Sequence, residues 1–242
     1  MVLYTAIAAI LLAITHLYAE RMKSTAIPRS KWLSFAGGIS VAYIFVHLLP
    51  ALQEGQEYLQ DHSFGISFLK HPVYVVALLG LATFYGVERA AILSSKSERA
   101  VEDKELSDTS HTFWVHMASF SVYNALIGYL LIHKEKESLA TLVFFTIAMA
   151  FHFLLNDYGL YDHYRDMYRR KGRWVITAAI LGGWLAGTLI ALPKIWISLL
   201  YAFVAGSTIL NVLKEELPEE RKSNFWAFSS GLLVYSVLLI AT

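Results

Sequence analysis

Hydrophobic residues in this chain fall into eight long runs separated by short polar segments. Each run has about the 20 residues that an α-helix needs to cross the ~30 Å hydrocarbon core of a bilayer. The pattern predicts eight transmembrane helices, at residues 2–18, 32–50, 72–93, 112–132, 138–156, 174–192, 195–213 and 224–241. Because these spans and their connections use the whole chain, we expect residues 1–242 to form one all-α polytopic domain embedded in the lipid bilayer.

Composition agrees with a membrane protein. The chain is 56% hydrophobic and has a mean hydropathy of +0.49, whereas a soluble domain is typically about 45–50% apolar. No basic segment precedes Leu3 and no small-residue cleavage pattern follows Leu17, so we expect the first span to be a retained helix rather than a signal peptide. The chain has no cysteine, which excludes thiolate chemistry, and its net charge of +1 argues against a nucleic-acid partner.

Basic residues lie mostly on one side of the predicted membrane. Sixteen of the 20 Lys and Arg residues occur in the connections that follow odd-numbered spans. Cytoplasmic connections carry the excess of positive charge, so we expect both termini to face outward from the plasma (cytoplasmic) membrane. The longest hydrophilic connection, residues 94–110, predicts a mobile cytoplasmic loop, and the polar outer segment 53–70 predicts a short amphipathic element.

Polar side chains gather on one face of the fifth span and on one face of the fourth. His152 and Asn156 are one helical turn apart, and His116, Ser119 and Tyr123 follow the spacing i, i+3, i+7. Lipid does not tolerate such groups, so we expect these two spans to lie side by side with the polar faces toward each other. Helix packing through hydroxyl and small residues is the alternative explanation for the span-four residues.

The second and seventh spans share a sequence pattern. Gly38 precedes Pro50 by twelve residues, as Gly206 precedes Pro218, and a leucine stands before each proline. The charge distribution makes span two run outward and span seven inward. Similar elements of opposite direction predict an inverted repeat with a substrate site near the midplane, in which spans 1–3 pair with spans 6–8 and spans 4 and 5 lie between them.

Two segments carry a resemblance to a known family. HLLP at the end of span two and AGSTILNVLKEELPEE at span seven resemble the ZIP family of divalent-metal transporters, whose seventh span has an AG-T-LY-E-LPE pattern. Eight spans, outward termini, a long loop after span three and a 3+2+3 inverted repeat are also similar, so the resemblance covers the whole chain. It implies transport of a divalent cation such as Zn, Fe or Mn by a homodimer, and it implies neither an enzyme nor a resident cofactor.

In that family, span four carries an HNxPEG motif, and span five carries a His followed four residues later by Glu or His. By this resemblance His152 matches the span-five metal ligand and Asn156 stands at the second ligand position. Ser119 and Tyr123 stand at the span-four ligand positions, with His116 one turn earlier as a substitute.

The departures from the family pattern concern the metal ligands. Neither span contains a proline, and residues 94–110 lack the histidine cluster common in the family. Zn²⁺ and its neighbours prefer imidazole, thiolate and carboxylate, and a buried divalent ion needs anionic ligands to offset its desolvation. Asp157 is the nearest carboxylate, but it lies about 100° round the helix from Asn156. The resemblance therefore implies a ZIP-like fold with a weakened or altered metal site.

Three functions remain open. The first is a ZIP-like transporter of divalent cations with an altered site, and the second is a ZIP-fold protein that carries another solute, acts as a sensor or binds a partner. The third is a membrane metal-dependent hydrolase, in which His47, His116 and His152 would converge around a metal-bound water. His16, near the end of the first span, is expected to be an ordinary packed or interfacial residue.

Overall fold

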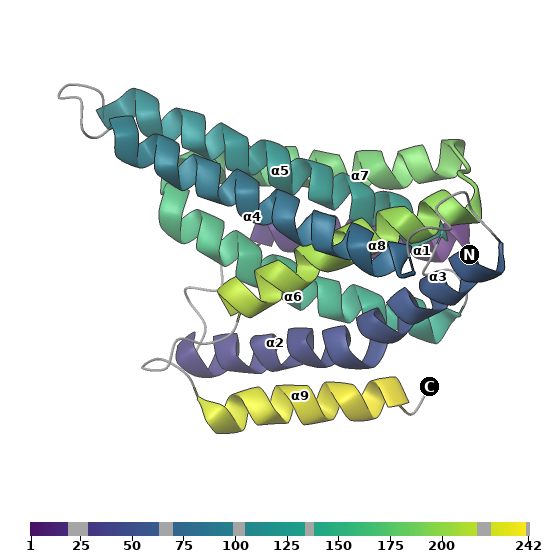
Figure 1. Ribbon diagram of the computed structural model, residues 1–242. Helices are drawn as coiled ribbons and strands as arrows, with labels where there is room; N and C mark the ends of the chain where they lie inside the picture. Colours follow the sequence, from purple (N-terminus) through teal and green to yellow (C-terminus); the bar gives the residue numbers. More distant parts are fainter. Residues whose placement is uncertain (19–28, 63–69, 99–104, 134–137, 217–223, 241–242) are drawn as a thin grey trace.

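The computed structural model describes residues 1–18, 29–62, 70–98, 105–133, 138–216 and 224–240, and all regular secondary structure in these ranges is helical (Figure 1). The α-helices are α1 Val2–Tyr18, α2 Arg29–Tyr43, α3 Leu49–Asp61, α4 Pro72–Glu98, α5 Glu105–His133, α6 Leu139–Met167, α7 Arg173–Leu189, α8 Lys194–Asn211 and α9 Phe225–Ile240. Three π-helical segments continue them: η2 Ile44–Leu48, η3 Tyr168–Gly172 and η4 Val212–Glu216. Each predicted span overlaps described helix, although residues 190–192 of the sixth predicted span are not helical and residue 241 of the eighth lies outside the described part of the chain.

The described helices are compatible with a membrane protein. Five helical stretches are long and apolar enough to cross a bilayer, and α1 and α9 are shorter apolar helices; the five are Lys31–Asp61, Pro72–Ala90, His111–His133, Leu139–Leu189 and Lys194–Lys214. Large apolar side chains such as Leu78, Leu189 and Trp226 are exposed, while His152 and Asp157 are buried. An apolar exterior around a polar interior is the arrangement that lipid requires.

Helix boundaries differ from the predicted ones around two connections. Helix α4 continues to Glu98 and α5 begins at Glu105, so much of the segment expected to be a loop at residues 94–110 is helical, and residues 99–104 lie outside the described part of the chain. Helix α3 accounts for residues 53–61 of the amphipathic element expected at residues 53–70, of which residues 63–69 lie outside the described part of the chain. It buries Leu52 and Leu59, while Gln56 accepts a hydrogen bond from the backbone N–H of Val73 at the start of α4 (3.1 Å).

The chain reverses direction between α6 and α7. Arg165 has φ 38° and ψ −104°, a backbone conformation that is rare for residues other than glycine, and it interrupts the helix there. Contacts with α1 fix the two directions. His16 near the end of α1 meets Asp157 in the second half of α6, whereas Thr5 near the start of α1 accepts a hydrogen bond from Trp184 near the end of α7. The stretch Leu139–Leu189 is therefore two antiparallel helices.

Helix α5 packs along α7 rather than along α6, so the prediction that spans four and five lie side by side is wrong for the helix axes. The physical reason is a pair of glycines. A Cβ atom on Gly128 would overlap the carbonyl oxygen of Ile180, and one on Gly183 would overlap that of Ala125. Without side chains at these positions the two backbones approach closely, and α6 reaches α5 through side chains instead.

Two further helix pairs, α2 with α9 and α4 with α8, make the other long contacts, and α2 and α9 lie side by side in Figure 1. Glycines again stand at the closest approach. A Cβ atom would overlap a backbone oxygen at four of them: Gly38 against Phe228, Gly231 against Phe35, Gly206 against Ala77 and Gly80 against Phe203. Backbone cannot move aside as a side chain can, so these positions fix the helix pairs.

Candidate functional site

Four polar residues from three helices meet in the interior, and we call them the His152 group: His152 and Asn156 of α6, Tyr123 of α5 and Thr208 of α8. The Tyr123 hydroxyl lies 2.9 Å from His152 Nε2 and 2.7 Å from Thr208 Oγ1. The Asn156 amide nitrogen lies 3.1 Å from the same His152 nitrogen. All four residues are buried. As expected, Tyr123 therefore lies beside the face of α6 that carries His152 and Asn156.

Helical periodicity positions these side chains. His152 and Asn156 are separated by four residues and project from the same face of α6. Tyr123 is held from the other side by an edge-to-face contact with Phe84 of α4, with ring centroids 5.6 Å apart. Thr208 also donates to the carbonyl oxygen of Val204 one turn earlier in α8 (2.9 Å), which fixes the rotamer that turns its oxygen toward Tyr123.

The hydrogen-bond directions define what the His152 group offers a ligand. His152 Nε2 lies within hydrogen-bond distance of both the Asn156 amide nitrogen and the Tyr123 hydroxyl. Because Thr208 donates its proton to Val204, the single Tyr123 proton goes to Thr208. Neutral imidazole is the form that binds metal ions. The other groups contribute two hydroxyl oxygens and one amide, and none of the four carries a negative charge.

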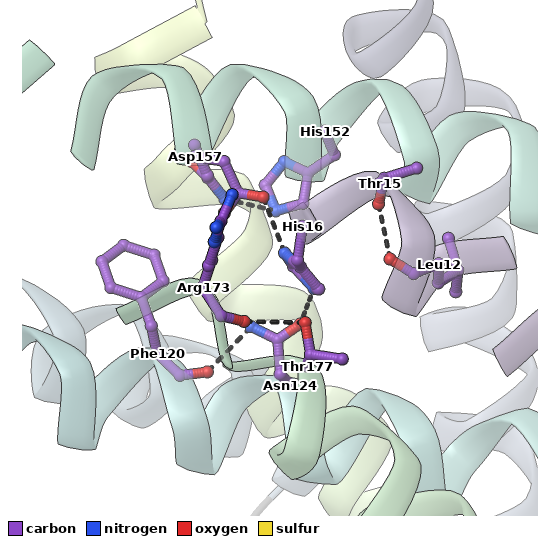
Figure 2. Close-up of polar contacts among 10 residues, drawn as sticks. Leu12, Thr15, His16, Phe120, Asn124, His152, Asp157, Arg173 and Thr177 are labelled. Atoms are coloured by element: carbon purple, nitrogen blue, oxygen red, sulfur yellow. Dashed lines mark hydrogen bonds and ion pairs between the residues drawn. The ribbon is translucent and has the colours of Figure 1, made fainter. Parts of the chain in front are cut away.

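A second set of buried residues adjoins the first, and we call it the His16 group: His16 of α1, Asp157 of α6 and Asn124 of α5. His16 Nδ1 lies 2.7 Å from Asp157 Oδ2, and His16 Nε2 lies 3.0 Å from Asn124 Oδ1. The His16 ring also stacks on Phe153, with centroids 4.6 Å apart. Figure 2 shows the three residues converging, with His152, Arg173 and Thr177 beside them.

The protons of the His16 group can be assigned from its acceptors. Asn124 Nδ2 donates to the backbone carbonyl of Phe120 (2.8 Å), an atom that only accepts, so the amide oxygen must face His16. His16 Nε2 therefore carries a proton, and a second proton lies between His16 Nδ1 and the Asp157 carboxylate. The pair has no net charge whichever of these two atoms holds that proton, which is why it can be buried.

The remaining predicted site residues lie elsewhere. The Tyr164 hydroxyl lies 2.6 Å from His116 Nδ1, in a smaller apolar cluster with Phe113 and Met117. His47 lies in η2 and stacks on the Tyr43 ring at 5.2 Å.

Ser119 is half-buried on α5, and no described hydrogen bond joins it to His152 or Asn156. Within the described ranges, no three His, Asp or Glu side chains are close enough together to hold a metal ion. The structure thus brings Tyr123, His152 and Asn156 together, and it gives Asp157 a partner of its own.

Sequence reasoning missed three residues of the interior: His16, Asn124 and Thr208. Asn124 and Thr208 were not expected at the site, and His16 was expected to be an ordinary packed or interfacial residue. The sequence does contain a signal for the contact between His16 and Asp157, because these complementary groups lie at corresponding ends of two apolar spans. Nothing in the sequence pairs α1 with α6, so the contact itself required the structure.

Together the fold and these two groups define a helical bundle that is compatible with a bilayer and has a polar centre. No protein-family model matches the sequence, and a search of curated proteins finds no match.

Proposed function

We propose that the protein is a ZIP-like membrane transporter through which a divalent cation passes by way of the His152 group. The observation that carries the proposal is the convergence of His152, Asn156, Tyr123 and Thr208 from three helices in the interior of the bundle. Polar side chains inside membrane-spanning segments are costly, and they characteristically line the path of a substrate.

The glycine contacts support a 3+2+3 inverted repeat. Phe35 precedes Gly38 by three residues as Phe203 precedes Gly206, and Ala77 precedes Gly80 by three as Phe228 precedes Gly231. The α2–α9 and α8–α4 contacts pair corresponding members of these sets. The π-helical segments agree as well, since η2 begins six residues after Gly38 and η4 six residues after Gly206. Equivalent residues making equivalent contacts are expected of paired repeat units.

Under this proposal the metal site is weak. A divalent ion at His152 would take over the Nε2 lone pair and use hydroxyl or amide oxygens for its remaining ligands. The nearest carboxylate, Asp157, is already paired with His16, whose Nδ1 lies 2.7 Å from its Oδ2. No anionic ligand then offsets the loss of water from the ion, so binding is weaker than at a site containing Glu.

A specific observation also favours a second candidate, a ZIP-fold protein that does not transport metal. His152 Nε2 already has two hydrogen-bond partners within the protein, and the His16 group is closed by its own hydrogen bonds. Such a core also suits an uncharged polar solute or a purely structural function.

Uptake by proteoliposomes separates the two candidates. The purified protein would be reconstituted and tested for accumulation of Zn²⁺, Fe²⁺ and Mn²⁺, beside Asn156→Ala and protein-free liposomes. We expect uptake by the wild type that Asn156→Ala reduces, because the substitution removes a polar group from the path. Wild-type vesicles that accumulate no more metal than protein-free liposomes would exclude metal transport and favour the second candidate.

A further inference from the structure

The last residue of α8, Asn211, is a buried polar side chain whose amide nitrogen has no hydrogen-bond partner among the described residues. The residue is 8% exposed. A buried amide without a partner is unfavourable, so its presence in an apolar bundle requires a reason.

The face of α8 on which Asn211 lies is fixed by its neighbours. Gly206 marks the opposite side, where α8 packs against the backbone of Ala77 in α4. Thr208 is three residues before Asn211, so the two share a face. Because the Thr208 hydroxyl contacts Tyr123, this face is turned toward the His152 group.

The level of Asn211 along the bundle follows from two layers of contacts. Leu130, Phe145, Val204 and Thr208 line one small cavity together, and Thr208 also contacts Tyr123, whose hydroxyl lies 2.9 Å from His152 Nε2. Passing from the far wall of this cavity to His152 therefore follows α6 forward from Phe145 and α8 forward from Val204 to Thr208. One more helical turn brings Asn156 on α6 and Asn211 on α8 to the same level.

We propose that Asn211 is a further residue of the substrate path, contacting a divalent cation or its hydration water one turn beyond His152. Its amide presents an N–H to a bound water, or its oxygen to the ion after rotation about the last side-chain bond. The cavity that Thr208 helps to line, about 20 Å³ in volume, lies next to the His152 group and is walled mostly by apolar side chains. This inference rests on the proposed function of the His152 group.

The experiment that tests this position of Asn211 introduces single cysteines, which is possible because the chain has none of its own. Asn211→Cys places a thiol at the proposed position, and Leu210→Cys places one at the adjacent, partly buried position of α8 as a control. Cd²⁺ would be titrated by calorimetry into each variant and into Asn211→Cys combined with His152→Ala. We expect Asn211→Cys to bind Cd²⁺ about tenfold more tightly than wild type and Leu210→Cys, and we expect loss of His152 to abolish the gain. Equal affinities in the two cysteine variants, or a gain that survives loss of His152, would overturn the inference.

A second variant separates ligand contact from structural support. Asn211→Leu replaces an unpartnered amide with an apolar group of similar size, so its melting temperature should equal or exceed that of the wild type while zinc uptake falls. A lower melting temperature with unchanged uptake would assign Asn211 a structural role and overturn the inference. Cysteine-dependent Cd²⁺ binding in a protein that transports no metal would refute the proposed function and leave Asn211 in the polar site.

Discussion

Removing one member of the His16–Asp157 pair tests whether these two buried side chains depend on each other for the stability of the folded protein. The two side chains are 1% and 2% exposed, so solvent does not screen their interaction. Breaking a buried ion pair by removing one partner typically costs about 3–5 kcal/mol, because the remaining group stays buried without its counterpart. We therefore expect His16→Ala and Asp157→Ala each to lower the free energy of unfolding by about this amount. The combined change to His16→Leu and Asp157→Leu should cost much less than the sum, since an apolar pair needs no partner.

The assay is unfolding by SDS in mixed micelles, followed by circular dichroism of the helices. Wild type, both single alanine variants and the double alanine variant form a cycle that isolates the pairwise energy. We expect a coupling of at least ~2 kcal/mol, since contacting residues couple by about 0.5–3 kcal/mol and this pair is fully buried. Single-variant losses that add to within about 0.5 kcal/mol would refute the assignment of His16 and Asp157 as a mutually dependent pair.

Two glycine substitutions test the helix contacts by the same unfolding assay. Gly206→Ala should destabilise the protein by about 1–3 kcal/mol or more, because its Cβ meets the backbone of Ala77 and the helices must separate. Gly182→Ala is the matched control, because a Cβ there meets nothing within 4 Å, and it should stabilise α7 by up to about 1 kcal/mol through helix propensity. Equal effects of the two substitutions would contradict the close α4–α8 contact.

The long apolar helices were largely predictable because each contains a run of apolar residues that is bounded by polar segments. Residues 2–18 were expected as a span and form α1 with the same bounds. The boundary at residues 94–110 was not predictable, because charged and serine-rich sequence is compatible with a solvated helix end as well as with a loop. Hydropathy does not predict which helices pack together. The α5–α7 contact depends on Gly128 and Gly183, and glycine in an apolar span indicates close packing without naming the partner.

The polar centre was predicted in part. The spacing of His152 and Asn156 identifies one face of α6, and Tyr123 was expected opposite it, as the hydrogen bonds show. Asp157 was considered only as a carboxylate pointing away from Asn156, and the structure explains that direction by its pairing with His16. His116 lies one turn before Ser119 on the same face of α5, but it contacts Tyr164 instead of His152. Tyr164 lies after the end of the fifth predicted span, which stops at residue 156. Helical periodicity predicts which residues share a face, but it does not predict which residues of a neighbouring helix they contact.

Calorimetric titration of Zn²⁺, Cd²⁺ and Mn²⁺ into the wild type and Asn156→Glu tests the proposed metal site most directly. We expect weak binding by the wild type, because the His152 group offers one imidazole and otherwise only neutral groups. A carboxylate at position 156 supplies the missing negative charge, and a net gain of ~1.4 kcal/mol would tighten binding about tenfold. Tight binding by the wild type, or an affinity that the carboxylate leaves unchanged, would contradict the placement of the metal site at His152 and Asn156.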